Sequence, residues 1–307
     1  NKQLFLLCKL NMKKYLFLLF IAAQNIAHTQ TQQQWAQLVG WDGVSHYSKY
    51  IIFNAGHMGP NALTIPAITT GSIDSVNAIG LSGQLHFAKG DKTQNFNLYG
   101  NFCLARNRVS VNVNWIPIEF FKMSDTIKRE RHVYYQNYFD KQAKGDVLFS
   151  TNINLLNKWR NKTQLALRVG IRLPSSSSKG VAAARFIDAT SYLVDVSLGK
   201  MINQRLKWMS MAGLYVWQMD KGDLRQNDAF LFGSGFEWNN NNWKLQPYFA
   251  GYLGYEAKSG DKPIVFRFNA EKKINKIIFL LCLQQGLNDF KYTSIETGIK
   301  WLLKSTN

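Results

Sequence analysis

The feature that most constrains the fold is an alternation of apolar and polar residues that recurs from about Asn77 to Leu302. In the segment Thr163–Leu173, every second residue from Leu165 onward is apolar, and the residues between them include Arg168 and Arg172. Because successive side chains of a β-strand point to opposite faces, such a segment has one apolar and one polar face. The pattern therefore predicts either a soluble sandwich with an apolar core or a transmembrane barrel whose apolar face meets lipid.

The start of the chain has the layout of a secretory signal peptide. Met12-Lys13-Lys14 forms a short positive region, Tyr15–Ala23 is an apolar run, and Ala27-His28-Thr29 precedes a plausible cleavage site before Gln30. The run is shorter than the ~20 apolar residues that a membrane-spanning helix needs. We interpret Asn1–Asn11, which lies upstream of this layout, as an upstream translation artefact. The sequence thus indicates an exported protein.

Composition narrows the possible partners. The formal net charge is +18, but the lysines and arginines are dispersed and many lie in predicted turns, as in Lys158–Lys162. In an exported chain this charge is better explained by anionic lipid or anionic solutes than by nucleic acid. Aromatic residues make up 14% of the chain, with 9 tryptophans, which suits the aromatic girdles of a membrane barrel.

The alternating segments have the length and spacing of membrane-crossing strands. Most have about 11–14 residues, enough for a tilted strand to cross a bilayer. Short turns and longer connections alternate between them, which is typical of outer-membrane barrels, where periplasmic turns are tight and external loops are longer. The predicted strands are Asn77–Ala88, Thr93–Leu104, Arg108–Phe121, Gly145–Leu156, Thr163–Leu173, Thr190–Met201, Lys207–Met219, Asp228–Trp238, Trp243–Ala257, Pro263–Lys273, Lys276–Gly286 and Phe290–Leu302.

The sequence therefore predicts an all-β protein, a transmembrane antiparallel up-and-down β-barrel of about 12 strands. We divide the chain into upstream residues and signal peptide (1–29), a periplasmic plug or cap segment (30–76), the barrel (77–302) and a C-terminal tail (303–307). The segment before the barrel mixes aromatic residues with turn formers and is not strand-like. It fits inside the lumen as a plug, and it fits equally well below the barrel as a cap.

Charged and aromatic residues on the predicted inner faces are the candidate binding residues. Arg168, Arg172 and Arg267 form a possible basic stripe for anionic solutes, and Tyr99, Tyr248 and Tyr252 are candidate contacts of the wall. Glu237, Glu256 and Glu296 complete the set. Buried charges must pair or meet water. The same residues are therefore open to a second interpretation, a salt-bridged filling that stiffens the barrel.

Catalytic and cofactor signals are weak. Ser45-His46-Tyr47-Ser48 has a His-x-Ser spacing similar to that of the outer-membrane phospholipase, but it is followed by Lys49-Tyr50 and precedes the barrel. The remaining histidines have no metal-ligand spacing, and no phosphate loop or nucleotide fingerprint occurs. We expect no enzyme, no catalytic residue, no metal and no cofactor.

Two passages resemble known families. Gly145-Asp146-Val147 and Leu165–Ser175 resemble a strand start and a strand end of the outer-membrane family linked to the phenol meta-cleavage pathway, which is similar to the long-chain fatty-acid channels. Gly59-Pro60-Asn61-Ala62 contains the residues of the fatty-acid channels' hatch motif in a different order, so no hatch mechanism is transferred. The resemblance implies a barrel with an N-terminal plug and passive uptake of hydrophobic or aromatic solutes, without catalytic residues.

The leading functional hypothesis is a channel of the outer membrane for passive uptake of small molecules, including hydrophobic or aromatic ones. The alternative is a closed structural or surface-binding barrel without transport, with Tyr134, Tyr135, Tyr138 and Phe139 of the long connection Lys122–Lys144 in the binding role. We expect a monomer whose partners are outer-membrane lipid and a small solute, not nucleic acid.

Overall fold

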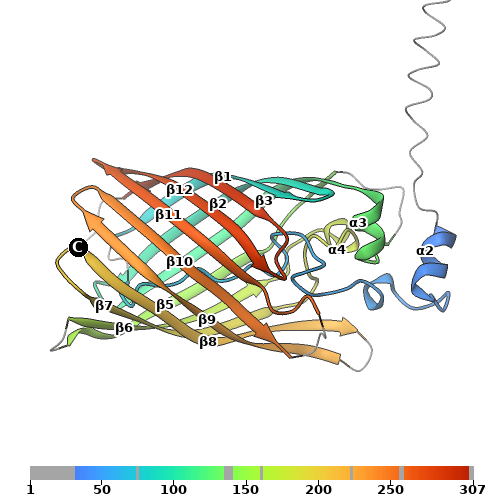
Figure 1. Cartoon of the computed structure of the whole chain (residues 1–307), viewed down its shortest axis with the longest axis horizontal. Coiled ribbons are helices and arrows are strands. Elements are labelled where there is room, and N and C mark those ends of the chain that lie inside the picture. The colour runs from blue at the N-terminus through green and yellow to red at the C-terminus, as the bar shows by residue number, and fades with distance from the viewer. Residues whose placement is uncertain are drawn as a thin grey trace, which may run out of the picture.

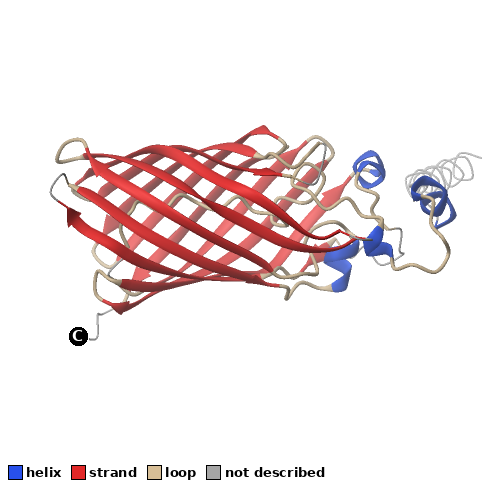
Figure 2. Cartoon of the chain, turned by 90° about the horizontal axis from the view of Figure 1, so that it is seen from below, coloured by secondary structure: helices blue, strands red, loops and turns tan. Residues whose placement is uncertain are grey.

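The computed structural model describes residues 32–73, 76–134, 141–159, 162–221, 224–255 and 259–303. Within them, a closed barrel is built from 12 long antiparallel strands (Figures 1 and 2), and β1 pairs with β13 to close the sheet. None of the helices in these ranges is long and apolar enough to cross a bilayer. The long strands are β1 (Ala78–Ala88), β2 (Asp91–Ala105), β3 (Val109–Met123), β5 (Val147–Trp159), β6 (Thr163–Leu173), β7 (Ser191–Met201), β8 (Leu206–Lys221), β9 (Leu224–Asn240), β10 (Trp243–Gly254), β11 (Ile264–Ile274), β12 (Ile277–Asn288) and β13 (Thr293–Leu302).

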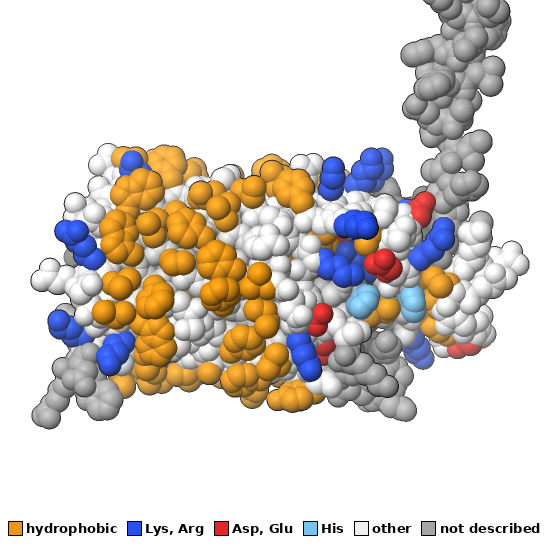
Figure 3. Space-filling view, viewed as in Figure 1, with side chains coloured by type: hydrophobic (Ala, Val, Ile, Leu, Met, Phe, Trp, Pro, Cys, Tyr) orange, Lys and Arg blue, Asp and Glu red, His pale blue; other side chains and the backbone are white. Residues whose placement is uncertain are grey.

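The barrel is apolar outside because the alternation in the sequence follows the pleat of each strand. In β2, Phe96 and Phe102 are exposed, whereas Asn95 and Asn97, one residue away from Phe96, are buried. The same alternation continues around the barrel and produces the belt of apolar side chains seen in Figure 3. An apolar belt around a closed sheet with no free edge is the arrangement that a bilayer requires. The predicted fold class is confirmed.

Several connections differ from the prediction. Asp220–Asn227 is predicted as a loop, but β8 and β9 continue through most of it and form a hairpin in which Gln218 pairs with Gln226. The two long connections contain short elements: α3 (Asp125–Glu130), β4 (Gln142–Ala143) and α4 (Ser178–Ala182). These elements are too short to give a periodic signal in the sequence. The predicted signal peptide lies outside the described residues.

The two ends of the barrel are unlike. We call the end with the connections after β2, β5, β7, β9 and β11 the turn end, and the opposite end, which carries α3 and α4, the loop end. Helix α2 (Gln32–Val39) and the short 3-10 helix η1 (Tyr47–Lys49) also lie beyond the loop end (Figures 1 and 2). The sequence led us to expect this part of the chain on the turn side, because β1 begins there.

Residues 51–73, called here the inner segment, run through the barrel from the loop end to the turn end, as their contacts at the two ends show (Figure 1). Near the loop end, the backbone N–H of Gly59 donates to the carbonyl of Ala184 at 2.8 Å. Near the turn end, a Cβ built on Gly199 of β7 would lie 2.1 Å from the carbonyl oxygen of Thr70. Glycine at position 199 thus allows the inner segment to lie directly against the barrel wall.

The hydrophobic core lies inside the barrel, between the inner segment and one side of the wall. Ile51, Met58 and Leu63 of the inner segment are at most 2% exposed and belong to one cluster with wall residues of β8 and β10. Trp217 and Tyr252 are two of these wall residues, and both are fully buried. Burial of this apolar surface, worth roughly 25 cal/mol per Å², holds the inner segment in the lumen.

Candidate functional site

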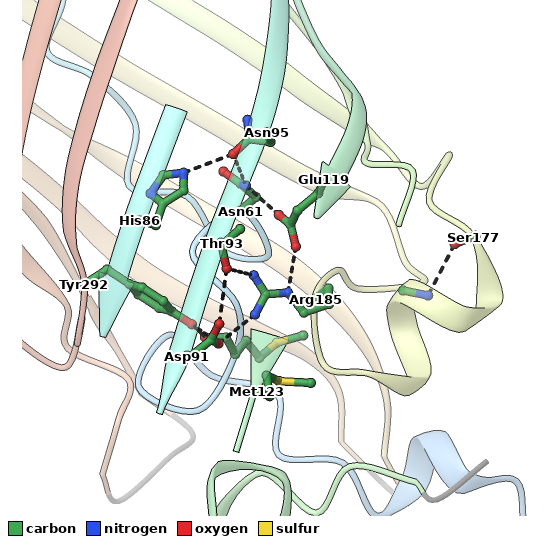
Figure 4. Close-up of polar contacts among 12 residues, drawn as sticks. Asn61, His86, Asp91, Thr93, Asn95, Glu119, Met123, Ser177, Arg185 and Tyr292 are labelled. Carbon is green, nitrogen blue, oxygen red and sulfur yellow. Dashed lines mark hydrogen bonds and ion pairs between the residues drawn. The ribbon is translucent and has the colours of Figure 1, made fainter. Parts of the chain in front are cut away.

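A buried polar cluster closes the loop end of the barrel, and Arg185 lies at its centre (Figure 4). Its Nε donates to Oε1 of Glu119 at 2.6 Å, and its Nη1 donates to Oδ2 of Asp91 at 2.7 Å. Nη2 donates to the hydroxyl of Thr93 at 2.5 Å. Asp91 and Thr93 lie on β2 and Glu119 on β3, so one arginine from the connection after α4 joins two strands of the wall.

The connection after β3 reaches the same carboxylate. Arg131, the C-terminal cap of α3, donates from Nη1 to Oδ2 of Asp91 at 2.7 Å and from Nη2 to the Tyr292 hydroxyl at 2.9 Å. The hydroxyl of Tyr292 in turn donates to Oδ2 of Asp91 at 2.6 Å. Asp91 therefore anchors both long connections to the rim of the barrel.

The inner segment is tied into this network through Asn61. Its Nδ2 lies 3.0 Å from Oδ1 of Asn95 and 2.6 Å from Oε2 of Glu119. His86 of β1 extends the network, with Nε2 3.1 Å from Oδ1 of Asn95. We call these nine residues the mouth cluster: Asn61, His86, Asp91, Thr93, Asn95, Glu119, Arg131, Arg185 and Tyr292.

The charges of the mouth cluster balance. Arg131 and Arg185 face Asp91 and Glu119, and the side chains of Arg185, Asp91 and Glu119 are 0% exposed. An unpaired ion in such a place costs several kcal/mol, whereas paired and hydrogen-bonded ions are tolerated. The guanidinium of Arg185 also lies over the ring of Phe121, 4.8 Å from its centroid. The mouth cluster is therefore stable only while wall, connections and inner segment stay together.

Residues before the inner segment form an outer layer over the mouth cluster. The indole Nε1 of Trp35 donates to the carbonyl of His132 at 3.0 Å, and its ring meets that of Tyr134 edge-on at 4.7 Å. Burial raises the pKa of Tyr47, whose hydroxyl donates to the carbonyl of Ser178 at 3.3 Å. The Ser45 hydroxyl and backbone N–H groups hold the pKa of Asp42 below its usual range. This layer links the N-terminal residues to both long connections.

The three arginines of the predicted basic stripe each have a separate partner. Arg168 Nε donates to Oδ2 of Asp195 at 2.6 Å. Arg172 Nη2 donates to the hydroxyl of Ser191 at 3.0 Å, and its Nε is 3.7 Å from Oδ2 of Asp146. Arg267 Nη2 donates to the carbonyl of Ile65 in the inner segment at 2.8 Å. The two arginines of β6 are therefore paired as in a salt-bridged filling of the barrel. The arginine of β11 instead contacts the inner segment.

The predicted tyrosines lie in two places. Tyr248 and Tyr252 are buried in the core, and the hydroxyl of Tyr252 is 3.5 Å from the carbonyl of Leu63. Tyr99 is half-buried nearer the turn end, and its hydroxyl donates to the carbonyl of Ile299 at 3.0 Å. All three face inward, but only Tyr248 and Tyr252 belong to the core cluster.

The predicted glutamates are engaged by neighbouring strands. Glu237 of β9 accepts from Gln246 at 2.8 Å and pairs with Lys207 at 3.1 Å. Glu296 of β13 accepts from Ser82 at 2.5 Å and from Gln84 at 2.9 Å. Glu256 lies outside the described residues. These contacts connect adjacent strands of the wall.

The His-x-Ser motif forms a local cap. Nδ1 of His46 lies 2.9 Å from the hydroxyl of Ser48, and the His46 side chain also accepts from the backbone N–H of Ser48 at the start of η1. Ser48 is 1% exposed, so an ester could not reach its hydroxyl in this conformation. Across the described ranges, no group of three His, Cys, Asp or Glu side chains is placed to hold a metal ion.

Sequence reasoning did not find the mouth cluster. Asp91 is predicted as a turn residue, and Arg185 is predicted as part of a long connection. One signal was present: Arg185 interrupts the otherwise small and apolar run Gly180–Ile187, as expected for a buried cation that needs an acidic partner. The identity of that partner depends on contacts between residues 66 and 94 positions apart.

Comparison by sequence finds no matching protein family and no matching curated protein. By structure, the chain is similar to the COG4313 outer membrane channel from Pseudomonas putida F1, with a TM-score of 0.58 and 10% identity, covering 78% of this chain and 100% of that one. It is also similar to the NanC porin, with a TM-score of 0.50 and 11% identity, covering 73% of this chain and 100% of the porin.

These similarities concern the fold. The closed barrel with an apolar belt is an outer-membrane β-barrel, and the two solved structures named above are a channel and a porin. The mouth cluster and the course of the inner segment are described from the residues of this chain alone, and the similarity to these structures does not extend to them.

Proposed function

We propose that this protein is a passive outer-membrane channel for small molecules, among them hydrophobic and aromatic ones, and that the inner segment is its removable plug. The observation that supports the proposal is the course of the inner segment, which has contacts with the wall or its connections near both ends of the barrel. This segment belongs to no strand, and near the loop end its Asn61 donates to Glu119 of β3, which also accepts from Arg185.

The side chains on the inner face of the wall suit apolar and aromatic solutes. When the inner segment leaves, the wall that it covers presents Tyr215, Trp217, Tyr248 and Tyr252, together with Met209 and Met211. Aromatic and thioether side chains form favourable surfaces for apolar and aromatic solutes. The opposite wall carries amide and hydroxyl groups such as those of Asn97 and Ser150, which can be hydrated.

The loop end faces the cell exterior in this proposal, because external connections of outer-membrane barrels are the longer ones. A solute then meets the outer layer and the mouth cluster first. Rearrangement of the connection that carries Ala184 and Arg185 would break the hydrogen bond from Gly59 to Ala184 and loosen the inner segment at the loop end.

The test is the conductance of the refolded mature chain, residues 30–307, in planar bilayers, compared with a chain that lacks residues 30–76. We expect small or rare steps from the mature chain and larger, frequent steps from the shortened one. Folding is checked by heat-modifiable migration on a gel. In an open channel, a small aromatic acid should block the current at lower concentration than glucose does.

A closed barrel without transport is the second candidate, and the balanced ion pairs of the mouth cluster favour it. If neither chain conducts although both keep heat-modifiable migration, the closed barrel is the better candidate. Its function would then depend on the outer layer.

A further inference from the structure

A set of exposed basic side chains surrounds the turn end of the barrel. We call it the turn-end rim, and it consists of Arg106, Arg108, Lys162, Lys200, Arg205, Lys272, Lys273 and Lys276. They lie in or beside four of the turns at this end, those after β2, β5, β7 and β11. Within the part of the chain that the structure describes, no member of the rim forms an ion pair.

Acidic side chains at this end do not neutralise the rim. Glu237 and Glu271 are the nearest, and both face the lumen. Glu237 pairs with Lys207, and Glu271 pairs with Lys244 and Lys300. On the face shown in Figure 3, the charged side chains that border the apolar belt at the turn end are basic, whereas basic and acidic side chains lie together at the loop end. The outer surface of the turn end is therefore positively charged.

Apolar side chains accompany the rim. Leu104 is 67% exposed near Arg106, Ile202 is 57% exposed near Arg205, and Ile274 is 46% exposed beside Lys273. Nζ of Lys272 lies 4.9 Å from the ring centroid of Trp243, which is itself 44% exposed. Aromatic side chains and the long side chains of lysine and arginine take this arrangement at the membrane interface. There the apolar parts contact acyl chains and the charged groups reach the lipid headgroups.

We infer that the turn-end rim binds the headgroups of anionic phospholipid in the leaflet that surrounds this end. Two observations favour lipid over an acidic protein or a soluble anion. The charges are distributed around the barrel, whereas a globular partner would contact one side of it. They also adjoin exposed aliphatic side chains, which a bilayer covers and a soluble anion does not. The inference is independent of whether the barrel transports a solute.

The test measures lipid retention by the full mature chain in detergent, using native mass spectrometry with phosphatidylglycerol and with phosphatidylcholine. We expect phosphatidylglycerol to be retained in preference, because each basic residue near an anionic headgroup strengthens binding by about fivefold at low salt. The variant Lys272→Gln/Lys273→Gln/Lys276→Gln should lose roughly tenfold or more in affinity, and the preference should fade as salt increases.

The matched control is Lys89→Gln/Lys92→Gln/Lys122→Gln, which removes three exposed lysines at the loop end. It should change phosphatidylglycerol retention less than twofold. The variant Lys272→Arg/Lys273→Arg/Lys276→Arg should retain the lipid, and heat-modifiable migration shows that each variant is folded. Three outcomes would each overturn the inference. They are equal retention of the two lipids, equal loss of phosphatidylglycerol in the rim and control variants, and displacement of the lipid by soluble glycerol phosphate.

Discussion

Nη1 of Arg185 lies 2.7 Å from Oδ2 of Asp91, although the two residues are 94 positions apart in the chain. Both side chains are fully buried. The contact joins the connection after α4 to the first residue of β2, and Arg131 and Tyr292 converge on the same oxygen. Because three side chains meet at this one carboxylate oxygen, their removal should loosen the loop end.

Arg185→Met should loosen the loop end. The substitution leaves Glu119 without its ion-pair partner, and breaking a buried pair costs about 3–5 kcal/mol. We expect a lower temperature for the loss of heat-modifiable migration and more frequent conductance steps. Arg129→Met, which removes an exposed arginine at the same end of the barrel, is the control and should change neither. If Arg185→Met keeps both properties of the native chain, the mouth cluster does not hold the barrel closed.

A disulfide between the inner segment and the wall should lock the channel. The hydroxyls of Thr69 and Ser197 are hydrogen-bonded, so Thr69→Cys/Ser197→Cys brings two thiols together. Cys103 and Cys282 are unpaired and would be replaced by serine. We expect low conductance under oxidising conditions and an increase on adding reductant, with each single cysteine variant insensitive. Full conductance of the oxidised double variant would show that solutes pass without movement of the inner segment near Thr69.

Gly199→Ala should displace the inner segment near the turn end. The added Cβ would lie 2.1 Å from the carbonyl oxygen of Thr70, closer than van der Waals contact allows. We expect greater conductance from a barrel that remains folded by heat-modifiable migration. Gly83→Ala is the matched control, because nothing lies within 4 Å of its added Cβ. Equal conductance of the two variants would place the constriction elsewhere in the lumen.

The side of the membrane that the N-terminal residues reach can be measured directly. Val44 is 90% exposed and lies beyond the loop end, whereas Gln204 is exposed in the turn after β7. In intact cells, a membrane-impermeant maleimide too large to enter the periplasm should label Val44→Cys and not Gln204→Cys. The reverse result would place the loop end on the periplasmic side and contradict the proposed orientation.

Ser48→Ala should leave any background ester hydrolysis unchanged. The Ser48 hydroxyl is buried and paired with His46 in the cap of η1, so its loss affects local structure only. A capping contact is worth about 1 kcal/mol. The measurement is hydrolysis of a chromogenic fatty-acid ester by the refolded chain in detergent. Native hydrolysis that is abolished in this variant would revive the esterase hypothesis.

The alternating pattern of the sequence was enough to predict the barrel and its two faces. Alternation is a local property, because each side chain of a strand points opposite to its neighbours, and a run such as Leu165–Leu173 therefore shows which residues face lipid. The inward orientation of Arg168 and Arg172 followed from the same rule, whereas the prediction of unequal ends came from the alternation of short turns and longer connections.

The interaction partners of the inward-facing residues became known only from the folded barrel. Arg168 pairs with a residue of the neighbouring strand, Arg267 with the inner segment, and Arg185 with strands that are distant in the chain. No local sequence pattern encodes such contacts. For the segment before the barrel, the sequence left a plug and a cap open, and it did not predict the route of residues 51–73, because irregular backbone has no period. The physical reason is that strand orientation depends on adjacent residues, whereas the filling of a lumen depends on which surfaces the closed barrel brings together.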